Sequence, residues 1–254
     1  NNIINSGAGN DIIFGHGGDD TISTDKGNDY ICGGPGNDYL SGGEGNDTYR
    51  WNLGDGLDTI YDSGNLDTIQ FGEGILWEHL TFQNYGPHLK IMVQGRDDQG
   101  IIISKFFSDP NFKIEKIKFF DGTSVNLSEI GLTLKQTDDV EAIQGTEFDD
   151  IIYAIGGNDR VNAGNGNDII YGGSGFDSLY GEQGNDILSG GKGNDMLYGG
   201  AGDDTYIYNL GDGLDTITDN DGNNIIKFGE GISWDDISFL RSNTNLEQIG
   251  RAHV

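Results

Sequence analysis

Aspartate recurs at every ninth position in two separate stretches of the chain, and this period constrains the fold more than any other feature. The recurring residues are Asp11, Asp20, Asp29, Asp38 and Asp47, and then Asp150, Asp159, Asp168, Asp177, Asp186, Asp195 and Asp204. A glycine stands two positions before nearly every one of them, and an apolar residue or a tyrosine stands two positions after. A nine-residue recurrence, five-fold in the first stretch and seven-fold in the second, predicts stacked repeats, each of which is one small structural unit.

Each nine-residue unit divides into a turn of six residues and a strand of three. One unit reads GGPGNDYLS from Gly33 to Ser41, and another reads GGKGNDMLY from Gly190 to Tyr198. Glycine dominates the turn because the backbone there must reach positive φ, which a side chain penalises. Successive side chains of a strand point to opposite sides, so the middle residue of the three points inward. Stacked units would therefore bury a ladder of Ile, Leu and Val side chains.

The recurring aspartates should stack in columns at the turns. Carboxylates spaced one strand apart repel one another, so such a column predicts cations between its members. Carboxylate and carbonyl oxygens in a flexible turn suit calcium, whereas zinc and softer metals prefer His and Cys, and the chain has one Cys and four His. The alternative is a solvated acidic face without metal, but solvation does not require a nine-residue register.

The repeated unit resembles the haemolysin-type, or RTX (repeats-in-toxin), calcium-binding nonapeptide. The resemblance implies an all-β fold, a right-handed parallel β-roll with two units in each turn of the coil. It also implies that each ion lies between turns on the same side, held by the aspartate of one unit and by carbonyls or the aspartate of the unit two further on. A block of n units then holds n − 2 ions, so blocks of five and seven units would hold about eight Ca²⁺ ions. The twelve aspartates named above are the expected ligands.

Five segments follow from the repeat boundaries. We expect a first β-roll block over residues 1–70, a small β-rich segment over residues 71–141, and a second β-roll block over residues 142–227. Residues 228–248 would begin a second β-rich segment, because the sequence around residues 42–82 recurs with an offset of 157, for example at Trp77 and Trp234. Residues 249–254 read like a translated sequencing adapter, so this chain is expected to be a fragment.

The middle segment leaves the nine-residue register and is rich in Ile, Val and Phe. Strands are predicted from Leu89 to Gln94, from Ile101 to Phe107 and from Ile114 to Phe120. Asp121-Gly122 predicts a tight hairpin turn after the third of these strands. Residues 75–80 and 232–237 are candidates for short helices. The segment resembles the haemolysin-type calcium-binding-related domain that follows RTX blocks.

The acidity of the chain follows the repeats. The formal charge is −28; residues 71–141 hold seven basic and eleven acidic residues, which gives −4 and leaves −24 for the rest. This charge argues against nucleic acids and anionic membranes as partners. It also destabilises the compact metal-free chain, so folding should depend on calcium. No apolar run is long enough for a transmembrane segment.

Other kinds of site are weaker explanations of the same residues. Asp219, Asp221, Asn223 and Glu230 have the spacing of EF-hand ligands, but the glycine of that loop is missing and the flanks read as strands. A degenerate roll unit with Asn224 in the aspartate position explains them better. Paired acids such as Asp19-Asp20 already belong to the repeat frame, and no nucleophile motif is present, so no catalytic site is expected. The single cysteine, Cys32, cannot form an internal disulfide and is expected to be a passive strand residue.

The sequence therefore predicts a secreted or cell-surface array that binds calcium, folds outside the cell and structurally supports neighbouring domains of a larger chain. The pathway of export implied by the resemblance is type I secretion. The larger protein could be a surface adhesin with a calcium-stiffened stalk, a pore-forming toxin, or a protease or lipase that carries the array at its C-terminus. The expectation for this chain itself is that it is not an enzyme.

Overall fold

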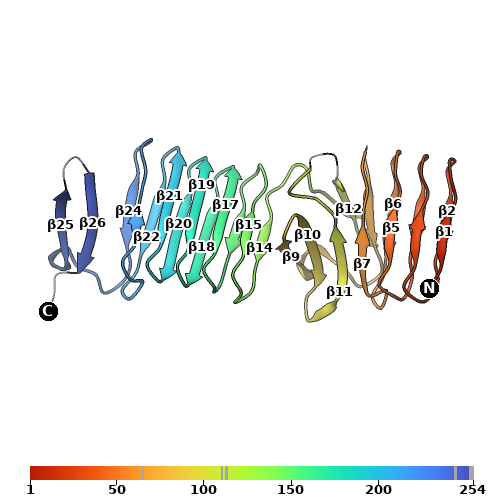
Figure 1. Ribbon diagram of the computed structural model, residues 1–254, viewed down its shortest axis with the longest axis horizontal. Helices are drawn as coiled ribbons and strands as arrows, with labels where there is room; N and C mark the ends of the chain where they lie inside the picture. Colours follow the sequence, from red (N-terminus) through yellow and green to blue (C-terminus); the bar gives the residue numbers. More distant parts are fainter. Residues whose placement is uncertain (65, 110, 112–113, 243–244, 252–254) are drawn as a thin grey trace. The chain divides into compact units, whose positions relative to one another are not determined.

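The computed structural model describes residues 1–254 apart from 65, 110, 112–113, 243–244 and 252–254. It divides into two compact units, Asn1–Ile130 and Gly131–Val254, both built from strands (Figure 1). The helical segments in the described part of the chain are two single turns of 3-10 helix, η1 (Trp77–His79) and η2 (Trp234–Asp236). None of the described helices has the length and apolarity needed to span a membrane. The all-β prediction is confirmed.

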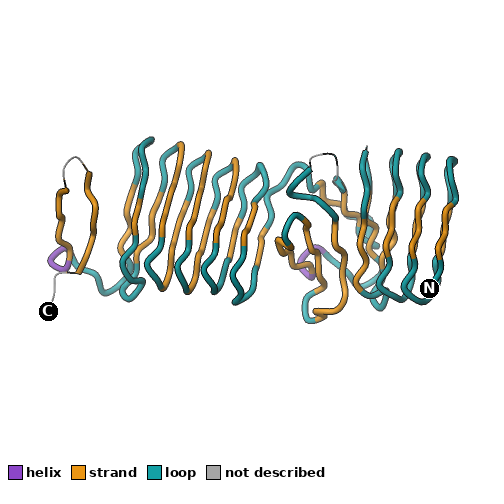
Figure 2. The backbone as a smooth tube through the Cα atoms, viewed as in Figure 1, coloured by secondary structure: helices purple, strands orange, loops and turns teal. Residues whose placement is uncertain are grey.

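The first unit begins with one short strand in every repeat. These strands are β1 (Ile3–Asn5), β2 (Ile12–Phe14), β3 (Thr21–Ser23), β4 (Tyr30–Cys32), β5 (Tyr39–Ser41) and β6 (Thr48–Trp51). Odd and even strands belong to two different sheets, and all pairs are parallel. Thr21 of β3 lies opposite Tyr39 of β5, eighteen residues later. Two nine-residue units therefore make one turn of the coil, as the resemblance implied, and strand and turn alternate along each coil (Figure 2).

The coil continues past a two-residue insertion at Trp51 and Asn52. The next strands are β7 (Leu57–Ile60) and β8 (Thr68–Phe71). They pair in parallel with β5 and β6, but the partners are now twenty residues apart, as in Tyr39↔Thr59. The turn takes up the two extra residues, so the inward-facing column is kept.

The middle segment extends both sheets of the first roll. Strands β9 (Leu80–Tyr85), β10 (His88–Val93) and β11 (Arg96–Ile103) form an antiparallel meander, and β11 also pairs in parallel with β7. Strand β12 (Lys116–Lys118) pairs in parallel with β8 and forms a hairpin with β13 (Ser124–Asn126). The segment is thus hydrogen-bonded to the last coil of the roll through two separate strands.

Two local predictions in this segment can be compared directly with the structure. The Asp121-Gly122 turn is confirmed, because the Phe119 amide donates to the Thr123 carbonyl at 2.9 Å and Gly122 has φ of 93°. The strand predicted from Ile101 to Phe107 ends at Ile103 instead. The chain leaves the sheet there because Lys105 adopts a left-handed conformation, with φ of 57°.

The second unit repeats the coil. Its two sheets consist of β14 (Thr133–Lys135), β16 (Ile151–Tyr153), β18 (Ile169–Ser174), β20 (Ile187–Lys192), β22 (Thr205–Tyr208) and β24 (Ile225–Phe228), and of β15 (Ala142–Gln144), β17 (Arg160–Asn165), β19 (Ser178–Gln183), β21 (Met196–Ala201) and β23 (Thr216–Ile217). An antiparallel hairpin of β25 (Ile237–Ser242) and β26 (Asn245–Arg251) follows. The adapter-like tail includes the end of β26, and residues 252–254 lie outside the described residues.

The inward column of each roll forms its core. The middle residue of the interior strands has almost no exposed surface: Ile22, Ile31, Leu40, Tyr49, Ile60 and Ile69 in the first unit, and Ile152, Val161, Ile170, Leu179, Leu188, Leu197 and Tyr206 in the second. Full burial of one such side chain contributes about 1.5–3 kcal/mol. Because the column continues only while units stack, each coil depends on its neighbours for stability.

Candidate calcium site

The recurring aspartates form a regular ladder along the turns. In each rung the backbone amide of one aspartate donates to Oδ1 of the aspartate one coil later, at 2.7 Å from Asp20 to Asp38 and from Asp168 to Asp186. Eight rungs join two of the twelve predicted ligands, three in the first block and five in the second. The structure therefore brings the predicted residues together in same-side columns, two units apart.

The second oxygen of these carboxylates has no hydrogen-bond donor. Oδ2 is buried and unpartnered in eleven of the twelve aspartates, which are Asp11, Asp20, Asp29, Asp38, Asp47, Asp159, Asp168, Asp177, Asp186, Asp195 and Asp204. Asp150 differs because the amide and hydroxyl of Thr146 both donate to its Oδ2. A buried carboxylate oxygen without a partner is costly, so eleven such oxygens in one register point to a missing positive charge.

In most units the first glycine, five residues before the aspartate, keeps the space beside this oxygen open. A Cβ on Gly172 would lie 2.5 Å from Asp177 Oδ2 and 2.5 Å from the carbonyl oxygen of Gly190, one coil further on. The two oxygens are therefore at most 5.0 Å apart, the sum of these distances. A carboxylate oxygen and a carbonyl oxygen on either side of such a space suit a hard cation with oxygen ligands, and Ca²⁺ accepts such irregular sets. The donors present fit calcium.

A second ladder, which the aspartate period did not predict, runs along the outer edge of the turns. Here the backbone amide of the residue before an aspartate donates to a side chain one coil earlier, not one coil later: the Asn28 amide donates to Asn10 Oδ1 at 2.9 Å, and the Asn185 amide to Asn167 Oδ1 at 2.8 Å. The signal in the sequence was the asparagine that precedes most of the aspartates. The two ladders together fix the turn backbone from both sides.

Burial raises the pKa of the ladder carboxyls. The pKa of Asp168 is raised from 3.8 to about 7, mainly because burial disfavours its charged form, and partly by the neighbouring Asp150 and Asp186. The same cause raises the pKa of Asp195 to about 7 and that of Asp186 to about 6. The metal-free roll therefore binds protons more tightly than the unfolded chain does.

This difference predicts that acid stabilises the calcium-free protein. The folded pKa values lie above the unfolded value, so the stabilisation is complete below about pH 4 and is lost as pH rises through about 6 to 7. In calcium-stripped buffers we therefore expect a clearly larger β-sheet signal in circular dichroism at pH 5 than at pH 8. In calcium the order reverses, because protons compete with the ion. An equal β-sheet signal at the two pH values in stripped buffers would contradict the prediction.

Several carboxylates outside the predicted set continue the ladder. Asp58, Asp67 and Asp215 accept from the amides of Asp38, Asp47 and Asp195 at 3.0, 2.8 and 3.0 Å. Glu115 accepts from the Asp67 amide at 2.9 Å, and the Glu141 amide donates to Asp159 Oδ1 at 2.8 Å. The two-residue insertions displaced Asp58, Asp67 and Asp215 from the nine-residue frame. Asn224 takes the same place opposite Asp204, which confirms a degenerate roll unit there.

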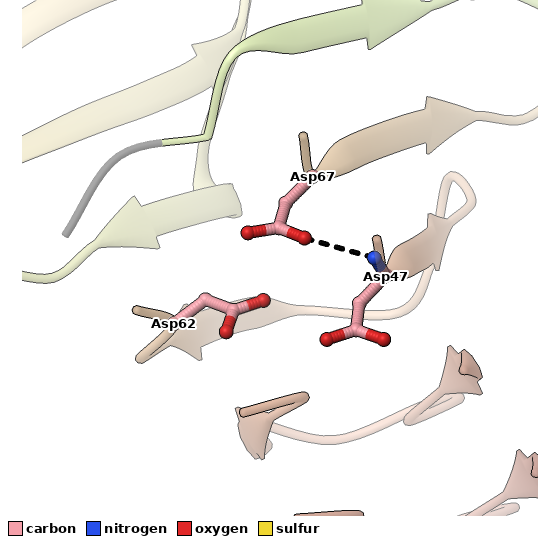
Figure 3. A group of neighbouring side chains, drawn as sticks. All are labelled: Asp47, Asp62 and Asp67. Atoms are coloured by element: carbon pink, nitrogen blue, oxygen red, sulfur yellow. Dashed lines mark hydrogen bonds between the residues drawn. The ribbon is translucent and has the colours of Figure 1, made fainter. Parts of the chain in front are cut away.

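One place in the described chain brings three buried carboxylates close together. Asp47, Asp62 and Asp67 each offer an oxygen within 4.8 Å of the other two (Figure 3). Burial raises the pKa of Asp67 to about 8 and the pKa of Asp47 to about 6. The neighbouring carboxylate of Asp62 also raises both pKa values. Asp62 was not among the predicted ligands, because it stands where other units have their first glycine.

Comparison with known proteins agrees with this geometry. Residues 1–31, 18–49, 137–170, 144–179, 171–206 and 180–214 match the RTX calcium-binding nonapeptide repeat. The chain belongs to the RTX calcium-binding nonapeptide repeat family. Residues 88–129 match a second family, described as the haemolysin-type calcium binding protein related domain. Both resemblances found in the sequence are thus confirmed, and the RTX repeats are calcium-binding repeats.

This RTX chain is similar to part of a much longer curated protein. Over 100 residues the chain is 34% identical to the iron-regulated protein FrpA of Neisseria meningitidis serogroup C. The match covers 36% of this chain and 9% of FrpA. The chain thus spans a small part of the length of that relative.

Proposed function

We propose that the twelve recurring aspartates hold about eight Ca²⁺ ions and that these ions fold the array outside the cell. The observation that carries the proposal is the buried Oδ2 without a donor, repeated in register in eleven of the twelve aspartates. The eight rungs that join two of these aspartates give the same number of ions as the repeat count does. Each ion would bridge two coils, so binding would stabilise the stack as well as the turn.

Secretion and a structural role follow from the same chemistry. Extracellular calcium modules bind with dissociation constants of about 10⁻⁴ to 10⁻³ M, which the cytosolic concentration of calcium does not reach. The array would therefore stay unfolded until export and fold at the surface or in the medium, where it would support the neighbouring domains of a larger protein. We propose that the array itself is not catalytic; an adhesin, a toxin or a secreted protease or lipase remains open for the whole protein.

Replacement of an interior ligand tests the assignment. Asp186 takes part in two rungs, since it accepts from Asp168 and donates to Asp204. We expect Asp186→Ala to lose about two ions, because nearest-neighbour coupling removes both sites that share the residue. It also leaves the Asp168 amide without its acceptor, at a cost of about 1–3 kcal/mol. The calcium midpoint of folding should rise and its cooperativity should fall.

Asp11→Ala is the matched control. Asp11 donates to Asp29 through its backbone amide, which alanine retains. We expect the loss of at most about one ion and a small change in midpoint. The measurement is a calcium titration of circular dichroism for the parent and both variants. Equal shifts for Asp186→Ala and Asp11→Ala, or none for either, would mean that the acidic period is only a solvated face.

A further inference from the structure

A carboxylate replaces glycine on the inner side of one turn, where the first block passes its insertion. Asp62 stands five residues before Asp67, as Gly42 stands five residues before Asp47. At the glycine positions the neighbouring space is kept for the carboxylate of the same unit: a Cβ on Gly42 would overlap Asp47 Oδ2. At the turn before Asp67 the space is instead approached by a second acidic side chain.

Neighbouring groups fix Asp62 in this position. Its Oδ1 accepts from the amides of Gly43 and Ser63 at 3.0 and 2.8 Å. Its Oδ2 accepts from the Tyr49 hydroxyl at 2.5 Å, and that hydroxyl in turn accepts from the Gly42 amide at 2.6 Å. Tyr49 takes the inward position where most units have Ile or Leu, so the core column itself holds the carboxylate.

The other two carboxylates bring oxygens without partners to the same point. Asp47 and Asp67 are 1% and 0% exposed, and in both the Oδ2 is buried and has no hydrogen-bond donor. Figure 3 shows the three side chains around a common space, and one oxygen of each lies within 4.8 Å of the others. Three buried carboxyl groups with two unpartnered oxygens are costly in their charged form, and a cation between them would offset that cost.

We propose that Asp47, Asp62 and Asp67 form a separate Ca²⁺ site at the end of the first nonapeptide block. The inference goes beyond the proposed function, because Asp62 and Asp67 belong neither to the twelve repeat ligands nor to the matched family ranges given above. The ligands are carboxylates, which favours a hard ion. Calcium fits better than magnesium, which keeps several waters and requires a near-ideal octahedron, because all three residues are at most 3% exposed.

The second unit contains a natural comparison in which one ligand is neutral. Asp204, Asp219 and Asn224 occupy the positions of Asp47, Asp62 and Asp67 at the offset of 157. The Tyr206 hydroxyl again accepts from the Gly199 amide and donates to Asp219 Oδ2. Asn224 Oδ1 accepts from the Asp204 amide at 2.8 Å. Asparagine therefore keeps the ladder hydrogen bond that Asp67 makes and removes only the charge. We infer that the second unit lacks this site.

Equilibrium dialysis with radioactive calcium tests the inference on the full chain. We expect Asp67→Asn and Asp62→Asn each to bind one ion fewer than the parent, the double variant to lose no more than that one ion, and Asn224→Asp to bind one ion more. Glu73→Gln, which removes an exposed charge, should bind as the parent does. Circular dichroism in millimolar calcium checks that each variant is folded.

The outcomes separate this inference from the proposed function. Parent-like ion number and affinity in both Asp67→Asn and Asp62→Asn would overturn the three-carboxylate site. Loss of one ion in Asp67→Asn but not in Asp62→Asn would also overturn it, because that pattern describes an ordinary rung between Asp47 and Asp67. A parent protein that binds no calcium at all would instead overturn the proposed function.

Discussion

Removal of calcium is expected to unfold most of the repeat array. The ladder carboxylates are buried in columns, and the chain carries a formal charge of −28. Without ions this charge opposes the compact state, and the binding energy of the ions becomes folding energy. We expect the β-sheet signal in circular dichroism to be largely lost in chelator and restored as calcium rises through about 10⁻⁴ to 10⁻³ M.

Magnesium provides the control for this experiment. It needs shorter bonds in a tighter octahedron and gives up its water reluctantly, so equal concentrations of magnesium should not restore the signal. The same β content in chelator and in calcium would contradict the prediction. Recovery of the fold by any divalent ion, or by high salt alone, would show that charge screening is sufficient and that no specific site is formed.

The second large effect is expected at a glycine where two coils meet. Gly184 has φ of 135°, and a Cβ there would overlap the carbonyl group of Gly166 in the preceding coil. The overlapped atoms are backbone, so the stack must open to make room. We expect Gly184→Ala to lower the free energy of unfolding in millimolar calcium by about 4 kcal/mol or more.

Gly211→Ala separates this close approach from backbone strain. Gly211 lies in the same compact unit, Gly131–Val254, and also has positive φ, 98°. No atom lies within 4 Å of the position that its Cβ would take. Strain alone should then cost about 1–2 kcal/mol. Denaturant unfolding in calcium measures both variants. Equal destabilisation would show that the coils are not in contact at Gly184.

The repeat period predicted stacked units, the inward-facing core column and columns of aspartates at the turns. The roll with two units in each turn, and the pairing of aspartates on the same side, came from the resemblance to the RTX nonapeptide. The repeat frame also placed Asn224 in an aspartate position before its hydrogen bond to the Asp204 amide was known. These predictions succeeded because the relevant contacts recur at a fixed spacing, eighteen residues within a block and twenty across an insertion.

What the sequence did not predict depends on contacts without a fixed spacing. The parallel pairing of β11 with β7 and of β12 with β8 joins residues more than forty positions apart, outside any repeat. Asp62 was missed because its partner Tyr49 is an inward core residue in a different coil, and nothing local in the sequence pairs a tyrosine with an acid thirteen residues later.

A crystal structure determined in millimolar calcium tests the central claim most directly. Anomalous scattering from the ions would locate each one relative to the ladder. We predict a calcium ion beside Oδ2 of each interior aspartate, including Asp168, Asp177 and Asp186, with carbonyl oxygens of the adjoining coil as further ligands. A folded roll in which ordered water or no density occupies these positions would contradict the account.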